Sequence, residues 1–318
     1  MRYAALADAE PAACPTGTPG GAFGLGSLDC RPEHSVSAGA ARPQVQIFTL
    51  GRFGLSVFEY AIEANGKAKH RPLVLLQALV ALGGRDVACS RLFEFLWPDS
   101  DGDLGGRNLN ITVHRLRQLL RARGALLQHN GKLTLNAQLC RVDIWDFERL
   151  ANRGLEGLGD PGTVRRAQSD LRAALALYTG HFLARESEEA WMLAPRMRLK
   201  TKFERLIAAL GGHFEQQRRF SDAIDICRQA LELDPLNEIF YRHMMSCYLK
   251  QGEELASVLS TYRRCREALA KGLSAPVSGE TEKLHGEALC AIERGAGQSN
   301  RVTPIAPPHR LGVQPEFD

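Results

Sequence analysis

The segment 107–123 carries its apolar residues in one narrow stripe, which predicts an amphipathic helix that packs by a single face. At about 100° per residue, Leu109, Val113, Leu116 and Leu120 fall on the same side. The opposite side is polar and basic, and it carries Arg107, Ile111, His114, Gln118 and Arg121, flanked by Asn108, Asn110, Arg115 and Arg117. The segment has five arginines and no acidic residue, so it lacks the mixed charges that stabilise a solvated helix through i,i+4 pairs. We therefore expect this face to meet a polyanion.

An extended segment and two helices are predicted ahead of this helix. Residues 45–58 form a β-prone run, and Asn65-Gly66 after it is typical of a tight hairpin turn. A first helix is expected to open at Arg71-Pro72 and to end at Gly83-Gly84, because proline suits a helix start and glycine a helix end. A second helix is expected to begin at Ser90, whose hydroxyl can cap the first turn.

A β-hairpin is predicted directly after the basic helix. Two extended runs, 126–128 and 133–135, are joined by a turn that contains Asn130-Gly131, the strongest short-range hairpin signal. Strands, three helices and a hairpin, in this order, make a winged helix-turn-helix, whose third helix enters the major groove while the hairpin touches the flanking backbone. We therefore predict an α+β winged helix domain, residues 44–137, that binds double-stranded DNA.

Positive charge is concentrated in the same part of the chain. Residues 42–140 carry thirteen basic and seven acidic side chains, a net charge of +6. Residues 1–41 carry two basic and four acidic side chains (net −2), and residues 141–318 carry twenty-five of each. An excess confined to one segment of domain size favours a polyanionic partner for that segment.

The chemistry of the side chains predicts what each of them contacts. Arg115 and Arg117 can grip guanine in a bidentate way or clamp a phosphate. Asn108 and Asn110 either read adenine or help to start the helix, and His114 either contacts a phosphate or faces solvent. The predicted DNA-binding residues are Arg107, Asn108, Asn110, Ile111, His114, Arg115, Arg117, Gln118, Arg121 and, at the tip of the hairpin, Asn130 and Lys132.

The C-terminal half is predicted to be an all-α, tetratricopeptide-like helical repeat domain, residues 141–292. One unit of roughly 34 residues is marked by Ile207, Leu210, Gly211, Phe214, Ala223, Cys227, Ala230 and Pro235. In this pattern Gly211 and Ala223 are small because two antiparallel helices touch there. A second, degenerate unit is marked by Tyr241, Met244, Met245, Tyr248, Gly252, Val258, Tyr262 and Cys265. Stacked helix pairs of this kind form concave surfaces for protein or peptide partners.

The sequence gives no support to an enzyme, a cofactor or a metal site. The eight cysteines include no Cys-x-x-Cys pair, and His129, His213, His243 and His285 show no metal-ligand spacing. The segment from Gly124 to Lys132 is no phosphate loop, because Leu133 stands where Ser or Thr is needed. We find no nucleophile beside a base, and we expect a protein that binds rather than one that catalyses.

Several motifs resemble those of the bacterial antibiotic-regulatory-protein type transcriptional activators. In the N-terminal half the matching positions are Leu50-Gly51-Arg52-Phe53, Arg71-Pro72, Leu75-Leu76, Leu92 to Asp99, Leu109 and His114-Arg115-Leu116-Arg117. In the C-terminal half they are Val142-Asp143, Phe147, Ala174 to Gly180, Phe182-Leu183, Trp191, Asp234-Pro235, Glu238, Pro276 and Glu280-Thr281. The resemblance covers about residues 44–290 and joins a response-regulator-type winged helix to a bacterial transcriptional activator domain with tetratricopeptide repeats.

The resemblance implies an activator that binds direct repeats upstream of a promoter and helps to recruit RNA polymerase, with a homodimer on DNA allowed by such repeats. The leader, 1–43, and the tail, 293–318, fall outside the two domains and are predicted to be disordered. No apolar run is long enough to cross a bilayer, and no secretory signal opens the chain. We therefore expect a cytoplasmic protein without a membrane partner.

The alternative is a protein-interaction adaptor that acts through its helical repeats. In that case the winged helix would serve as a pairing module, and the purified protein would not prefer its own upstream region over bulk DNA.

Overall fold

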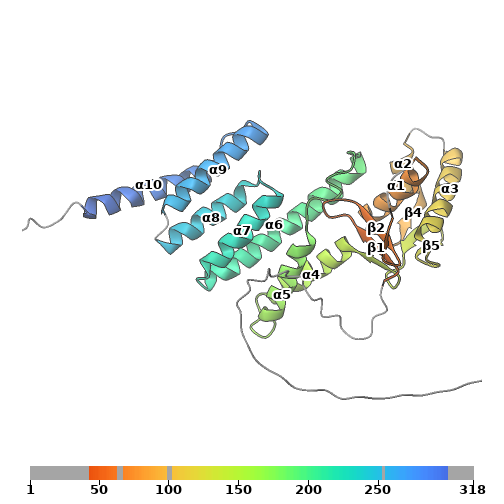
Figure 1. The fold of residues 1–318 in the computed structure, drawn as a ribbon, viewed down its shortest axis with the longest axis horizontal. Coiled ribbons are helices and arrows are strands. Elements are labelled where there is room, and N and C mark those ends of the chain that lie inside the picture. The colour runs from red at the N-terminus through yellow and green to blue at the C-terminus, as the bar shows by residue number, and fades with distance from the viewer. Residues whose placement is uncertain (1–42, 63–66, 99–101, 253–254, 300–318) are drawn as a thin grey trace, which may run out of the picture. The chain divides into compact units, whose positions relative to one another are not determined.

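The computed structural model describes residues 43–62, 67–98, 102–252 and 255–299 (Figure 1). The predicted leader, most of the predicted tail and the predicted Asn65-Gly66 turn lie outside these ranges. Among the described residues, no helix combines the length and the hydropathy needed to cross a bilayer.

The first three strands of the described chain belong to a four-stranded sheet. Its strands are β1 (Val45–Phe48), β2 (Gly54–Val57), β3 (Tyr60–Ala61) and β7 (Cys140–Val142), in the order β3-β2-β1-β7. Strand β1 is antiparallel to β2 and parallel to β7, with Ile47 opposite Leu55 on one side and Val142 on the other. Strand β7 therefore joins this sheet beside β1 although three helices and a hairpin separate the two strands in the sequence.

The turn between β2 and β3 is formed by Phe58 and Glu59, which the sequence analysis did not single out. Both residues have positive φ, 49° and 70°, and Val57 pairs with Tyr60 across them. Two positive φ values are what a two-residue type I′ hairpin turn requires. The sequence did not reveal this turn because neither residue is glycine.

The first two helices of the structure both begin before the positions predicted for them. Helix α1 (Lys67–Ala81) includes Pro72 in its second turn, where the missing N–H costs the helix one backbone hydrogen bond. Helix α2 (Cys89–Leu96) begins directly after Ala88, and no side chain caps it. Ser90 is therefore inside the helix and is not its cap.

The start of α2 is fixed by a strand instead of a capping side chain. Strand β4 (Val87–Ala88) pairs with β6 (Lys132–Leu135), and β6 pairs with β5 (Leu126–His129), which gives the sheet order β4-β6-β5. The backbone N–H of Cys89 donates to the carbonyl of Gly131 at 2.8 Å. The predicted hairpin is confirmed: Asn130 and Gly131 have φ values of 48° and 69°, and His129 pairs with Lys132.

The C-terminal half is helical, as predicted. Its elements are α4 (Asp143–Gly157), α5 (Val164–Leu177), the 3-10 turn η1 (Ala190–Met192), α6 (Leu193–Gln216), α7 (Phe220–Leu233), α8 (Glu238–Gln251), α9 (Leu255–Leu273) and α10 (Gly279–Ser299). Helix α10 runs past the predicted domain end at 292 to Ser299, so the first residues of the predicted tail are helical.

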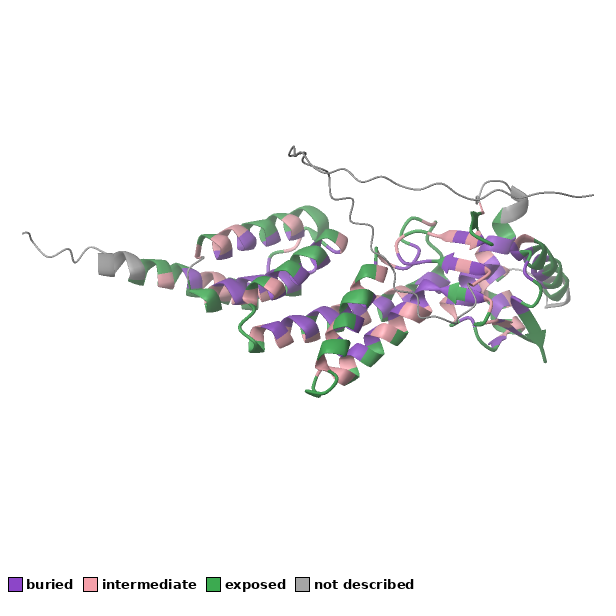
Figure 2. Cartoon of the chain, turned by 60° about the horizontal axis from the view of Figure 1, so that its bottom comes forward, coloured by how far each residue is buried: buried purple, intermediate pink, exposed green. Residues whose placement is uncertain are grey.

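Helices α6 to α9 stack as two antiparallel pairs (Figure 1). Figure 2 shows buried residues along the sides of these helices that face one another. The apolar residues that marked the two repeat units are buried except Pro235, and Gly252 ends α8 with a φ of 79°. One reason given from the sequence is wrong: Gly211 faces the ring of His243 in α8, whereas the prediction placed the close contact between the two helices of its own unit.

Two segments far apart in the sequence join the N-terminal part to the helical part. Leu50 pairs with Phe182 in an antiparallel bridge, and the N–H of Leu183 donates to the carbonyl of Thr49 at 2.8 Å. Gly51 has a φ of 95°, and a Cβ added to it would lie 2.9 Å from Thr179 Oγ1. Only glycine fits this close approach without strain.

Candidate nucleic-acid interface

Helix α3 (Gly102–Leu120) buries the stripe that the sequence predicted. Leu109, Val113, Leu116 and Leu120 are at most 3% exposed, and the helix packs against α1 and α2. Thr112 adds to this face: its hydroxyl is buried and donates to the carbonyl of Asn108 at 2.7 Å. Burial of the stripe fixes which side of α3 faces solvent.

The opposite face of α3 is exposed along its length between Arg107 and Gln118. The exposed residues of this stretch are Arg107, Asn108, Asn110, Ile111, His114, Arg115, Arg117 and Gln118. Ile111 is 51% exposed, so this face also presents one apolar side chain to solvent. His114 and Gln118 are joined by a hydrogen bond of 3.0 Å between the two Nε2 atoms, so these side chains are ordered one turn apart. No acidic residue interrupts this face between the two ends of the stretch.

The bounds of α3 differ from those predicted. The helix begins at Gly102, in the segment predicted to be a loop, so Asp103 belongs to it. It ends at Leu120, and Arg121 lies beyond it with a φ of 50°. Arg121 is exposed, but it does not continue the helical face. The helix proper carries three arginines, Arg107, Arg115 and Arg117, and one acid in its first turn.

Arg117 is bound to the hairpin rather than free at the surface. Its Nε donates to the carbonyl of Leu126 at 3.3 Å, and its Nη2 donates to Gln128 Oε1 at 3.4 Å. Both partners lie on β5. Arg117 therefore acts as a positioning residue that holds the hairpin against the C-terminal end of α3, and its contact with DNA stays a prediction.

Replacing Arg117 by alanine tests this positioning role. We expect DNA affinity to fall about three- to tenfold, because hydrogen bonds as long as these two contribute only roughly 1 kcal/mol to the placement of the hairpin. Lysine should restore the charge but not the pair of hydrogen bonds that arginine makes to β5. The Arg117→Lys variant should therefore bind DNA no more tightly than Arg117→Ala. Full recovery of affinity in the lysine variant, measured by fluorescence anisotropy, would show that charge alone matters.

The tip of the hairpin presents polar side chains to solvent. Asn130 and Lys132 are exposed, as predicted, and so is His129, which pairs with Lys132 across the turn. The sequence analysis passed over His129, although antiparallel pairing across an Asn-Gly turn places it opposite Lys132. The tip thus offers one fixed cation and two groups that can hydrogen-bond to phosphate.

A buried carboxylate links this N-terminal part to the first helix of the C-terminal half. Asp143 Oδ2 accepts from the backbone N–H groups of Thr49 (2.5 Å) and Leu50 (2.7 Å), and Oδ1 accepts from the Thr49 hydroxyl (2.8 Å). The N–H of Ile144 also donates to Oδ1 at 2.8 Å. Burial raises the pKa of Asp143, and the bonds from Leu50 and Thr49 oppose that rise. The residues directly after β1 are therefore tied to the start of α4.

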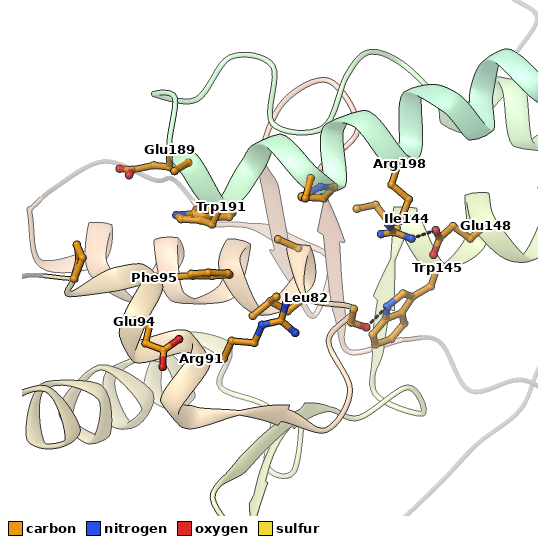
Figure 3. Close-up of a pocket in the computed structure, with 16 residues that line it drawn as sticks. Leu82, Arg91, Glu94, Phe95, Ile144, Trp145, Glu148, Glu189, Trp191 and Arg198 are labelled. Carbon is orange, nitrogen blue, oxygen red and sulfur yellow. Dashed lines mark hydrogen bonds and ion pairs between the residues drawn. The ribbon is translucent and has the colours of Figure 1, made fainter. Parts of the chain in front are cut away.

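A pocket of about 730 Å³ lies beside this link, where α2 faces η1 and α6 (Figure 3). Aromatic rings of Phe95, Trp145 and Trp191 line it, and the Trp145 indole N–H donates to the carbonyl of Gly83 at 3.0 Å. Arg198 pairs with Glu148 at its edge. The walls of this pocket thus come from α2, which packs against α3, and from the helical part.

The helical part has a match among known protein families. Residues 142–289 match the family model described as the bacterial transcriptional activator domain. This part of the chain is similar to that family. The resemblance inferred from the sequence is thereby confirmed for the activator domain, which begins at the last residue of β7 and includes α4 to α9 and half of α10.

A solved structure supports the fold over a longer stretch. Mycobacterium tuberculosis EmbR in complex with a low affinity phosphopeptide matches with a TM-score of 0.57 at 18% identity, covering 81% of this chain and 70% of that chain. At this identity the likeness concerns the fold. A search of curated proteins found no match. Two of the motifs behind the resemblance, Leu50-Gly51 and Phe182-Leu183, are the segments that join the activator domain to the N-terminal part.

Proposed function

We propose that this chain is a sequence-specific DNA-binding regulator of transcription, with a winged helix domain ahead of its activator domain. The observation that carries the proposal is the exposed face of α3, which is free of acidic residues from Arg107 to Gln118 and lies next to the β5–β6 hairpin. In a winged helix, this helix enters the major groove and the hairpin contacts the adjoining backbone.

The chemistry of each side chain on α3 determines which part of DNA it can contact. Arg107 and Arg115 can bind guanine edges or phosphates, and Asn108 and Asn110 can bind adenine. The exposed Ile111 offers an apolar contact for a thymine methyl group. On the hairpin, Lys132 is a phosphate contact, which adds affinity without sequence information.

The activator domain supplies the second half of the proposal. Its stacked helices form the kind of surface that binds protein partners, and we infer that it helps to recruit RNA polymerase to a promoter. Binding to direct repeats would place two protomers side by side on DNA. A regulator of chromosomal genes acts in the cytoplasm, which is where we place this chain.

Salt dependence and sequence preference test the DNA-binding half of the proposal. We expect the full chain to bind the region upstream of its own gene more tightly than a scrambled duplex of equal length. Log affinity should fall linearly with log salt, with a slope of about −0.9 for each phosphate neutralised. Fluorescence anisotropy at several salt concentrations measures both quantities.

Equal affinity for the two duplexes at every salt concentration would favour the alternative function. The protein would then be an adaptor that acts through its helical repeats, with only non-specific attraction to DNA.

A further inference from the structure

A cluster of three different metal-binding side chains lies between α6 and α8, away from the DNA-binding face. It consists of Glu215 on α6 and of His243 and Cys247 on α8. One ligand atom from each residue lies within 4.8 Å of the other two. Among the residues that the structure describes, no other three His, Cys, Asp or Glu side chains converge in this way.

The carboxylate of Glu215 is the centre of the cluster. Its Oε1 contacts His243 Nε2 and accepts a hydrogen bond from the Cys247 thiol, with 3.5 Å between Sγ and Oε1. Its Oε2 contacts the ammonium group of Lys250. The two α8 ligands are four positions apart and so lie on one face of the helix.

The packing of the two helices leaves room for the imidazole. A Cβ added to Gly211 would lie 2.4 Å from His243 Cε1, so the ring occupies the space that any larger residue on α6 would fill. The side chains of His243 and Glu215 are only 17% and 15% exposed, and Cys247 is fully buried. The donor atoms therefore come from ordered, largely enclosed side chains.

We propose that Glu215, His243 and Cys247 form a zinc site that joins consecutive helix pairs of the activator domain. Imidazole nitrogen, thiolate sulfur and carboxylate oxygen are the three protein donors that Zn²⁺ takes, and three of them with one water complete its tetrahedral coordination. Ligand bonds of about 2.0–2.3 Å need donors roughly 3.3–3.8 Å apart, which small side-chain rotations can reach from the observed positions.

Binding of zinc requires two changes at the cluster. Burial and the negative charge of Glu215 raise the pKa of the Cys247 thiol to about 12, so the thiol proton must pass to solvent as the Zn–S bond forms. Lys250 must release Glu215; its side chain is 50% exposed and can turn into water. Lys250 thus takes the place of the metal as the cationic partner of Glu215 when no zinc is bound.

Titration of the full chain with metal alone tests the site. Cys14, Cys30, the half-buried Cys89 and the exposed Cys290 are first replaced by serine, so that accessible thiols outside the cluster do not bind metal. We expect one equivalent of Zn²⁺ to bind in calorimetry, and Co²⁺ to give the visible bands of tetrahedral coordination with a thiolate-to-metal charge-transfer band. Cys247→Ser should remove the charge-transfer band, and both Cys247→Ser and His243→Asn should weaken zinc binding at least about 100-fold.

Two further variants keep the test decisive if a ligand variant is less stable. Lys250→Met should bind zinc roughly three- to fivefold more tightly, because it removes the ion pair that competes for Glu215. Cys265→Ser, which removes a buried thiol in the next helix, should leave zinc binding unchanged. The proposal fails if no charge-transfer band forms, if Cys247→Ser retains the band, or if Lys250→Met binds zinc no more tightly.

Discussion

Replacement of Asp143 by alanine is expected to lower the free energy of unfolding by about 4 kcal/mol. The carboxylate accepts from the N–H groups of Thr49 and Leu50 and from the Thr49 hydroxyl, and Thr49 is fully buried. Without Asp143 these donors have no acceptor and no access to water, and each unmet buried donor costs roughly 1–3 kcal/mol. Urea unfolding followed by circular dichroism measures the change.

Asp160 provides the matched control for this substitution. It also precedes a helix and accepts a backbone N–H, that of Gly162 at 3.0 Å, but it does so at an exposed turn. Asp160→Ala should therefore cost no more than about 1 kcal/mol, since water can replace the lost acceptor. Equal losses in the two variants would contradict the role given to burial of Asp143.

Joint replacement of Arg107 and Arg115 by alanine is expected to weaken specific DNA binding by about 30-fold or more. Each good arginine–base contact contributes roughly 1–3 kcal/mol, and ~2 kcal/mol corresponds to about 30-fold. Both side chains are exposed, so their loss should leave the packing of α3 intact. The thermal unfolding temperature should stay the same, and anisotropy titration measures the affinity.

Arg165 and Arg166 form the control for the lost charge. Both are exposed on α5, in the activator domain. Their double alanine variant removes the same net charge from a surface that we do not place on DNA. A similar loss of affinity in this control would mean that overall charge, and not the face of α3, governs binding.

Much of the fold follows from periodic patterns in the sequence. The stripe of α3, the Asn130-Gly131 turn and the helices of the repeat units each depend on neighbours within a few residues, and each was predicted. The starts of α1 and α2 were misplaced. Strand β4 fixes the start of α2 by pairing with β6, which follows it by more than forty positions, and such pairing leaves no local signal.

The residues of the candidate DNA interface could be predicted from the sequence, but the contacts that they make within the protein could not. Burial of the leucine stripe determines which residues face outward, so most of the exposed set was predicted. The bond from Arg117 to Leu126 and Gln128 depends on how the hairpin packs on α3. The Glu215–His243–Cys247 cluster was missed for the same reason: its ligands come from two helices, and Glu215 and Cys247 are 32 positions apart.

Sequencing of the genomic fragments that the purified full chain selects tests the central claim most directly. Recognition through α3 predicts that the enriched fragments share a short motif, repeated at a spacing of about one helical turn of DNA, roughly 10–11 base pairs. The Arg107→Ala/Arg115→Ala variant should lose this enrichment. Fragments without a common motif, or the same motif selected equally well by the variant, would contradict the assignment of α3 as the recognition helix.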